Sequence, residues 1–298
     1  MAEVSALVLA GGGSLGAVQV GMLQALVQAR ISIDLVIGAS VGAINGAYFA
    51  SRPDSHGVSE LASIWCGLSR RDIFPFSVLG AGVALLRGQG HLLTSQGLQH
   101  MIGRFLPAAR IEDSRLPLHI MTTDMLNGAE VLLSRGNLLK ALLASAAIPL
   151  VYPPVEIDGR LLIDGGVASN TPIASAVALG ATRILVLPTG FGCACTAPPR
   201  SLVARGLHTL NLMSMRQLVR DIALHQSRAR IHVAAPLCPL GVSVFDFSQT
   251  ASLIARARQQ TQIWLELGGL QQTAIPEALL AHSHPEMPTE ESADERTD

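Results

Sequence analysis

Two serines near the start of the chain stand in turns framed by glycines. Ser40 lies in Gly38-Ala39-Ser40-Val41-Gly42, directly after an apolar run and before a helical pattern. A serine at such a strand-to-helix turn presents its hydroxyl at the sheet edge, and glycines two residues before and after it relieve crowding. The spacing therefore predicts a nucleophile elbow, with Ser40 as the nucleophile and with Gly38 and Gly42 beside it.

The other turn, Gly11-Gly12-Gly13-Ser14-Leu15-Gly16, has the composition of an anion-binding loop. Consecutive glycines leave backbone N–H groups free to point at a negative charge near a helix N-terminus. Ser14 also fits the G-x-S-x-G pattern, but Ser40 has the clearer strand before it and smaller residues behind it. The N–H groups predicted to hold an oxyanion belong to Gly11, Gly12, Gly13 and Val41.

An aspartate followed by two glycines, Asp164-Gly165-Gly166, supplies a candidate base. Asp164 ends an apolar run, so its carboxylate is expected at the sheet edge, with flexible backbone at Gly165 and Gly166. A carboxylate that contacts Ser40 directly can act as its general base. The usual pKa of aspartate, about 3.9, is low for this task, so partial burial would help. A simple turn remains the alternative, and none of the nine histidines stands in a recognisable catalytic motif.

The first glycine turn also matches the dinucleotide fingerprint G-x-G-x-x-G. That fingerprint requires an acidic residue at the end of the next strand to hold the ribose. Asp34 lies at the start of that strand, and the strand ends at Ile37-Gly38 without an acid. A nucleotide-binding protein that uses Gly11 to Gly16 is thus a half-matched alternative.

The elements that position these residues follow from apolar periodicity. Strands are predicted at 6–10, 33–37, 118–123, 130–134, 155–157, 161–163, 183–187 and 231–235. Helices are predicted after Gly16 and at 41–50, within 58–110, and at 137–147, 173–179, 201–228 and 248–267, the last with Ser248 as N-cap. This alternation predicts an α/β fold in which helices flank a mainly parallel central sheet.

Composition limits the protein class and the organisation of the chain. The 298 residues are 49% hydrophobic and 14% charged, with a net charge of -1, which gives no electrostatic footprint for nucleic acid. We expect one domain over 1–281 and a disordered acidic tail over 282–298, where six acids accompany one arginine. Neither a secretory signal nor a membrane span is visible, which predicts a cytoplasmic protein with peripheral membrane contact left open.

Cysteine usage adds little chemistry. The chain has four cysteines, Cys66, Cys193, Cys195 and Cys238, too few for a disulfide framework at this length. Cys193 and Cys195 have no zinc-finger partners beside them, so we predict free thiols and no metal site. The apolar segment 73–86 is either a lid or membrane-facing element or part of the core.

The motifs and their order resemble the patatin-like phospholipases. The glycine loop, the elbow at Ser40 and the Asp164 motif match in sequence, and 144–149, 152–154 and 170–172 match further family segments over roughly 5–265. The resemblance implies a Ser40–Asp164 dyad and a patatin-like three-layer fold. It also implies hydrolysis of fatty-acyl esters of phospholipids or lysophospholipids, without metal or cofactor. One departure is Leu15, where the family usually has Arg or Lys; a catalytically silent lipid-binding protein is therefore a further alternative.

Overall fold

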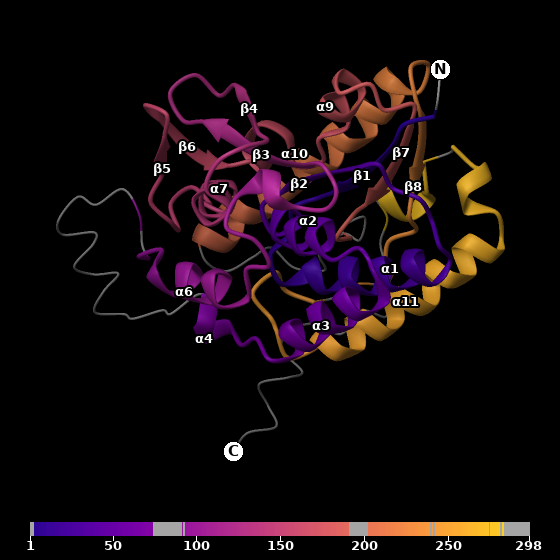
Figure 1. Cartoon of the computed structure of the whole chain (residues 1–298), viewed down its shortest axis with the longest axis horizontal. Coiled ribbons are helices and arrows are strands. Elements are labelled where there is room, and N and C mark those ends of the chain that lie inside the picture. The colour runs from indigo at the N-terminus through magenta and orange to yellow at the C-terminus, as the bar shows by residue number, and fades with distance from the viewer. Residues whose placement is uncertain are drawn as a thin grey trace.

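The computed structural model in Figure 1 describes residues 3–73, 91, 93–190, 202–238, 240, 242–273, 275–280 and 282. The predicted acidic tail lies outside these residues apart from His282, as do Cys193 and Cys195. The segment 73–86, predicted as a lid, membrane-facing element or core, is described only at Ile73.

One sheet runs through the molecule in the order β5-β6-β3-β2-β1-β7-β8, with β4 paired to β3. Strands β2, β1, β7 and β8 are parallel to one another, and β3 is parallel to β2. Strands β4, β5 and β6 form the antiparallel part. The strands are β1 (Ser5–Leu9), β2 (Leu35–Ala39), β3 (Leu118–Asp124), β4 (Glu130–Leu133), β5 (Val155–Ile157), β6 (Arg160–Asp164), β7 (Arg183–Leu187) and β8 (Arg230–Val233).

Helices cover both faces of this sheet, which makes three layers (Figure 1). The described helices are α1 (Gly16–Gln28), α2 (Val41–Ser51), α3 (Ser55–Cys66), α4 (Arg70–Ile73), α6 (Gln96–Phe105), α7 (Leu138–Ser145), α8 (Gly166–Ser169), α9 (Ile173–Ala178), α10 (Leu202–His225) and α11 (Thr250–Glu266). Short 3₁₀ turns lie at η1 (Gly13–Leu15), η2 (Ile111–Asp113), η3 (Gly269–Gln271) and η4 (Glu277–Leu279). The α/β prediction is confirmed.

Strand β1 shows how the period of two divides the core. Leu7 and Leu9 point into the larger apolar cluster, which also contains residues of α1, α2, α3, α6, α7 and α11. Ala6 and Val8 point into the smaller cluster with α9 and α10. Successive strand residues face opposite sides of a sheet, so a continuous apolar run is required where both faces are covered.

The carboxyl ends of β2 and β6 meet because both strands pair with β3. β2 lies along residues 118–121 of β3, and β6 lies along residues 122–124. β4 pairs with residues 120–123 and overlaps both, so it must occupy the opposite edge of β3. Ala39 therefore lies opposite Met121 and Asp164 opposite the next residue, Thr122. This end-to-end arrangement brings the residue after β2, Ser40, toward the last residue of β6.

The start of the second strand and the cap of the last long helix differ from the prediction, whereas the predicted turn at Asp158-Gly159 is confirmed. The second strand begins at Leu35 rather than at Ile33. Ser248 does not cap the last long helix: α11 begins at Thr250, whose hydroxyl donates to the carbonyl of Phe247 at 2.8 Å. Asp158 and Gly159 have φ values of 50° and 75° in the β5–β6 hairpin, as the predicted tight turn requires.

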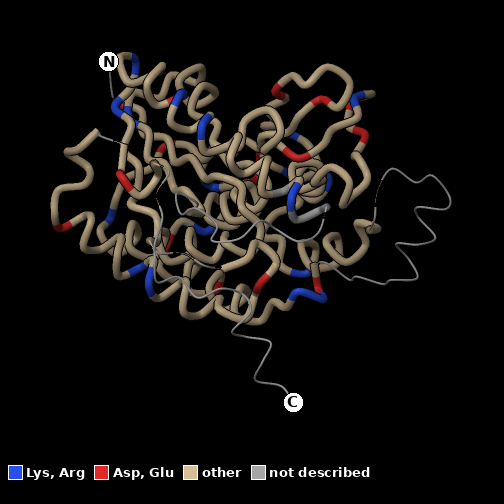
Figure 2. Tube along the Cα trace, turned by 180° about the vertical axis from the view of Figure 1, so that it is seen from behind, with Lys and Arg blue, Asp and Glu red and all other residues tan. Residues whose placement is uncertain are grey.

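Charged residues of both signs are interspersed along the described trace, as Figure 2 shows from behind. This distribution accompanies the small net charge of the whole chain. Among the described helices, none is long and apolar enough to cross a membrane.

Candidate active site

Ser40 occupies a sharp turn between β2 and α2. Its backbone has φ 54° and ψ -126°, a conformation that is strained for a residue with a side chain. A Cβ on Gly38 would overlap the backbone of Gly42, and one on Gly42 would overlap the carbonyl of Leu9. Only glycine fits at these two close approaches. The predicted elbow geometry is thus present in the structure, with Ser40 at the N-cap position of an eleven-residue helix.

Asp164 ends β6 and is buried. Only 6% of the residue is exposed, and its Oδ1 accepts a hydrogen bond from the N–H of Gly166 at 2.7 Å. Its Oδ2 is buried and has no hydrogen-bond partner of normal geometry among the described residues. A buried carboxylate oxygen without a partner is unusual and requires an explanation. Here one oxygen is fixed by the backbone while the other keeps its lone pairs available.

Burial raises the pKa of Asp164 to about 6, because the charged form loses its hydration. Hydrogen bonding from the Ser40 side chain and from the N–H of Gly166 opposes this rise. Ser40 is therefore close enough to lower the pKa, although its hydroxyl does not reach Oδ2 with normal hydrogen-bond geometry. Such contacts commonly tighten only when substrate binds. The carboxyl group therefore titrates at a higher pH than an exposed aspartate.

The glycine loop lies beside Ser40, and each of its three glycines packs against a different residue. A Cβ on Gly11 would lie 3.2 Å from the Ser40 Cβ and would overlap Asn170. One on Gly12 would overlap Thr189, and Gly13 has φ 58° against the carbonyl of Val244. The absence of side chains lets these neighbours hold the loop close to the serine.

The predicted set of oxyanion donors requires one correction. The N–H of Gly11 donates to the carbonyl of Asn170 at 3.2 Å, so it is not available to a ligand. Its carbonyl accepts from the Thr189 hydroxyl at 2.8 Å, which fixes the loop from the other side. The N–H groups of Gly12 and Gly13 make no hydrogen bond to a described residue. The N–H of Val41, in the first turn of α2, lacks an acceptor within that helix.

Ser14 and Leu15, the last residues of the loop before Gly16, point into the protein and not toward Ser40. The Ser14 hydroxyl donates to the carbonyl of Ser243 at 3.0 Å, and its N–H donates to the carbonyl of Val244 at 2.9 Å. Ser14 is therefore buried in a structural position. Leu15 is fully buried in the larger apolar cluster. Sequence reasoning noted Asn170 only within a matching family segment and missed Thr189, Ser243 and Val244, although Thr189 follows β7 at the edge where parallel strands place functional groups.

An apolar pocket reaches Ser40 from the side of α3 and α6. Ser40 and Val41 lie on its wall. The described lining comes from α2, α3, α4, α6 and α7 and the loops beside them, and it includes Leu61, Trp65, Leu98, Ile102, Leu142 and Phe247. The rings of Trp65 and Phe247 stack with centroids 6.2 Å apart. An apolar cavity that ends at a hydroxyl suits a ligand with a long hydrocarbon part and one polar group.

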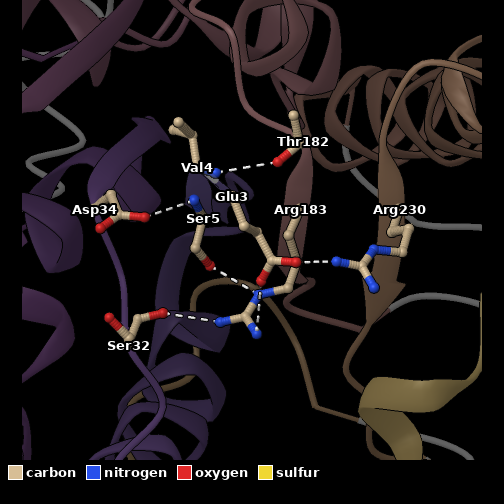
Figure 3. Close-up of polar contacts among 8 residues, drawn as sticks. All are labelled: Glu3, Val4, Ser5, Ser32, Asp34, Thr182, Arg183 and Arg230. Carbon is tan, nitrogen blue, oxygen red and sulfur yellow. Dashed lines mark hydrogen bonds and ion pairs between the residues drawn. The ribbon is translucent and has the colours of Figure 1, made fainter. Parts of the chain in front are cut away.

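The acid needed for dinucleotide binding lies at the wrong edge of the sheet. Asp34 accepts a hydrogen bond from the N–H of Ser5 at 2.7 Å, at the amino end of β1 (Figure 3). Figure 3 shows the neighbouring polar cluster, in which Arg183 and Arg230 pair with Glu3. The glycine loop lies beyond the other end of β1. Asp34 therefore ties the strand ends together and cannot meet a ribose held by the loop.

Known proteins match the part of the chain that contains this site. A family model described as patatin-like phospholipase matches residues 7–177, which include the glycine loop, Ser40 and Asp164. The chain belongs to the patatin-like phospholipase family. Membership in this family supports a lipid ester hydrolase function.

The relatives of this patatin-like chain include much longer proteins. Patatin-like phospholipase domain-containing protein 6 of Mus musculus is 32% identical over 187 residues, which cover 62% of this chain and 13% of the mouse protein. An uncharacterized NTE family protein of Mycobacterium bovis is 36% identical over 173 residues, 57% of this chain and 44% of that one. The matched part of the chain thus corresponds to about an eighth of the length of the mammalian relatives.

A solved structure shares the fold. Human GIVD cytosolic phospholipase A2, in complex with methyl gamma-linolenyl fluorophosphonate, aligns with a TM-score of 0.51. The alignment covers 93% of this chain and 59% of that one at 12% identity. The patatin-like three-layer fold predicted from the motifs is therefore confirmed.

Proposed function

We propose that this chain hydrolyses fatty-acyl esters of phospholipids or lysophospholipids, with Ser40 as nucleophile and Asp164 as general base. The main support is one arrangement: a buried carboxyl group lies beside a serine at a strained turn, and an apolar pocket opens onto that serine. The pocket would hold the acyl chain and place its ester carbonyl at Ser40. We expect the N–H groups of Gly12, Gly13 and Val41 to face the position where negative charge would develop.

In the first half-reaction, the Asp164 carboxylate accepts the Ser40 proton while Oγ attacks the ester carbonyl carbon. The resulting oxyanion is stabilised by the N–H groups of Gly12, Gly13 and Val41. Each such donor is commonly worth about 3–4 kcal/mol in the transition state. The ester C–O bond then breaks, Asp164 returns its proton to the leaving alcohol, and the acyl group stays on Ser40.

In the second half-reaction, water replaces the alcohol. Asp164 accepts a proton from the water as its oxygen attacks the acyl carbonyl, and the same N–H groups hold the second oxyanion. The bond to Ser40 Oγ breaks, and the proton held by Asp164 returns to the serine. A free fatty acid leaves, and the enzyme is regenerated.

A fluorophosphonate probe tests the central assignment, because it phosphonylates only a serine that is activated as a nucleophile. The purified chain would be treated with the probe, digested and mapped by mass spectrometry. We expect one adduct, on Ser40. An adduct on Ser14 would move the nucleophile to the glycine loop. A folded protein without any adduct would favour the catalytically silent, lipid-binding alternative.

The activity should depend on pH through Asp164. Only the ionised carboxylate can accept the serine proton, and burial raises its pKa to about 6. We therefore expect kcat/KM to rise about tenfold per pH unit below 6 and to level off above it. A pH–rate profile with a water-soluble ester, and circular dichroism at each pH to verify folding, would measure this. A rate that is flat between pH 4 and pH 7 would contradict the role of Asp164.

The pocket should set the response to acyl-chain length. Met101 lies on α6 and lines the pocket, so Met101→Trp should fill part of it. We expect kcat/KM for a palmitoyl ester to fall about tenfold or more, and that for a butyryl ester to change by less than about threefold. Steady-state assays with both esters would measure the difference.

Gln99→Trp is the matched control, because Gln99 is an exposed residue of the same helix and does not line the pocket. It should leave the activity on both esters unchanged. Equal losses on the two esters in Met101→Trp would mean that the pocket does not bind the acyl chain.

A further inference from the structure

The backbone N–H of Ser40 needs an acceptor that a regular strand or helix does not supply. Ser40 follows β2 and precedes the first residue of α2, and its φ of 54° turns the chain out of the sheet ladder. The residue is buried, so water cannot easily satisfy the group. Non-glycine residues in such conformations persist only where the surroundings fix them firmly.

The Ser145 hydroxyl supplies that acceptor from the last residue of α7. Its Oγ accepts the Ser40 N–H at 2.9 Å and donates its own proton to the carbonyl of Met121 at 2.7 Å. Ser145 is fully buried, so both bonds are sheltered from water. Because the Ser145 hydroxyl proton points at the Met121 carbonyl, a lone pair of the same oxygen is left to accept the Ser40 N–H. The elbow is thus linked to β3 through one oxygen atom.

The same short segment also binds the backbone at the aspartate. The carbonyl of Ser145 accepts the N–H of Gly165 at 3.2 Å, and the carbonyl of Ala147 accepts the N–H of Asp164 at 3.0 Å. The backbones of Ser40 and Asp164 are therefore both anchored to residues 145–147. A shift of this segment would change the separation between the two side chains.

We propose that Ser145 is a positioning residue, whose hydroxyl holds the Ser40 elbow at the correct distance from Asp164. This inference rests on the proposed function, because it assigns Ser145 to the geometry of that dyad. Ser145 does not touch the reacting atoms. It acts by fixing the backbone from which the Ser40 side chain projects, and the register of that backbone with β6.

The test compares Ser145→Ala with Ser51→Ala. Ser51 is a second buried serine, at the far end of α2, whose hydroxyl donates to the carbonyl of Ala47. We expect Ser145→Ala to lower kcat about 100-fold, with KM changed by less than about twofold, because the misplaced nucleophile still binds substrate. Ser51→Ala should leave both constants near those of the wild type. Ser145→Thr, which keeps the hydroxyl, should recover at least part of kcat.

Two further readouts separate positioning from simple loss of stability. The acid limb of the pH–rate profile should move to higher pH in Ser145→Ala, because Ser40 hydrogen bonding lowers the pKa of Asp164 in the wild type. Amide hydrogen exchange at Ser40, followed by NMR, should speed up about tenfold in Ser145→Ala and stay unchanged in Ser51→Ala.

The exchange measurement needs no activity, so it decides the role of Ser145 even if the fluorophosphonate experiment rejects Ser40 as the nucleophile. Unchanged exchange at Ser40 in a folded Ser145→Ala protein would overturn the inference. So would a kcat equal to that of Ser51→Ala. A lower melting temperature in Ser145→Ala, without faster exchange and without a shifted acid limb, would reduce Ser145 to a structural residue.

Discussion

Ser40→Ala is expected to lower kcat/KM by about 10⁴-fold or more, while the protein stays folded. Removing a catalytic nucleophile leaves only the contributions of substrate binding and oxyanion stabilisation. Alanine also tolerates the turn about as well as serine, because the two side chains are similar in size at φ 54°. Among the described residues, the Ser40 hydroxyl makes no hydrogen bond of normal geometry to Asp164 Oδ2 that the substitution would break. We therefore expect a change in unfolding free energy within about 1 kcal/mol.

The measurement pairs an ester-hydrolysis assay with thermal unfolding, and Ser51→Ala again serves as the control. Ser51 is the last residue of α2, and its buried hydroxyl donates to the carbonyl of Ala47 and lies 3.3 Å from the Ser114 hydroxyl, away from the site. Loss of turnover and of fluorophosphonate labelling in Ser40→Ala alone would assign the nucleophile. If the variant retained turnover above a hundredth of the wild-type rate, the nucleophile would lie elsewhere.

The elbow and the aspartate were predictable from sequence because their constraints are local. Glycines two residues from Ser40 record a crowded turn, and the overlaps at Gly38 and Gly42 are the physical reason for them. Asp164 ends an apolar run, so its place at a sheet edge follows from the strand. Local pattern also predicted the hairpin at Asp158-Gly159. These features depend on neighbours within a few positions along the chain.

The remaining parts of the site depend on contacts between distant segments. Gly11 was predicted as an oxyanion donor, but its N–H is bound to Asn170, a residue 159 positions away. The apolar pocket combines α2, α3, α6 and α7 with Phe247, and no single periodic pattern marks their common surface. Ser145 was noticed only as part of a resemblance. Its two hydrogen bonds become visible when β3, α7 and the turn at Ser40 are placed together.

Leu15 shows how a departure at one position leaves the proposed chemistry intact. Its side chain is fully buried in the core rather than placed beside Ser40. The loop therefore presents backbone N–H groups to the site, and these do not depend on the identity of residue 15. A positive side chain at this position would have to leave the core or remain buried without hydration. Burying its charge without hydration would lower the stability of the protein.

Asp164→Asn is expected to lower kcat/KM by about 10⁴-fold, because an amide cannot accept the serine proton. The acid limb of the pH–rate profile near pH 6 should also disappear, because the titrating carboxyl group is gone. Asparagine keeps nearly the same shape, and its Oδ1 can still accept the N–H of Gly166. Hydrolysis of a butyryl ester across pH 4–9 would measure both effects.

Stability should change in the opposite direction to activity. The folded-state pKa of Asp164, about 6, lies above its ordinary value of 3.8. The charged carboxylate therefore lowers the unfolding free energy increasingly as pH rises between these values. Above pH 6 the full loss of unfolding free energy is on the order of 3 kcal/mol.

Asp164→Asn removes the charge, so its unfolding free energy at pH 8 should equal or exceed that of the wild type, and the two unfolding free energies should converge toward pH 4. An inactive variant that is also less stable at pH 8 would indicate that Asp164 is a structural residue rather than the base. An inactive variant that is more stable at pH 8 is the result expected when a buried carboxylate serves catalysis and lowers the stability of the fold.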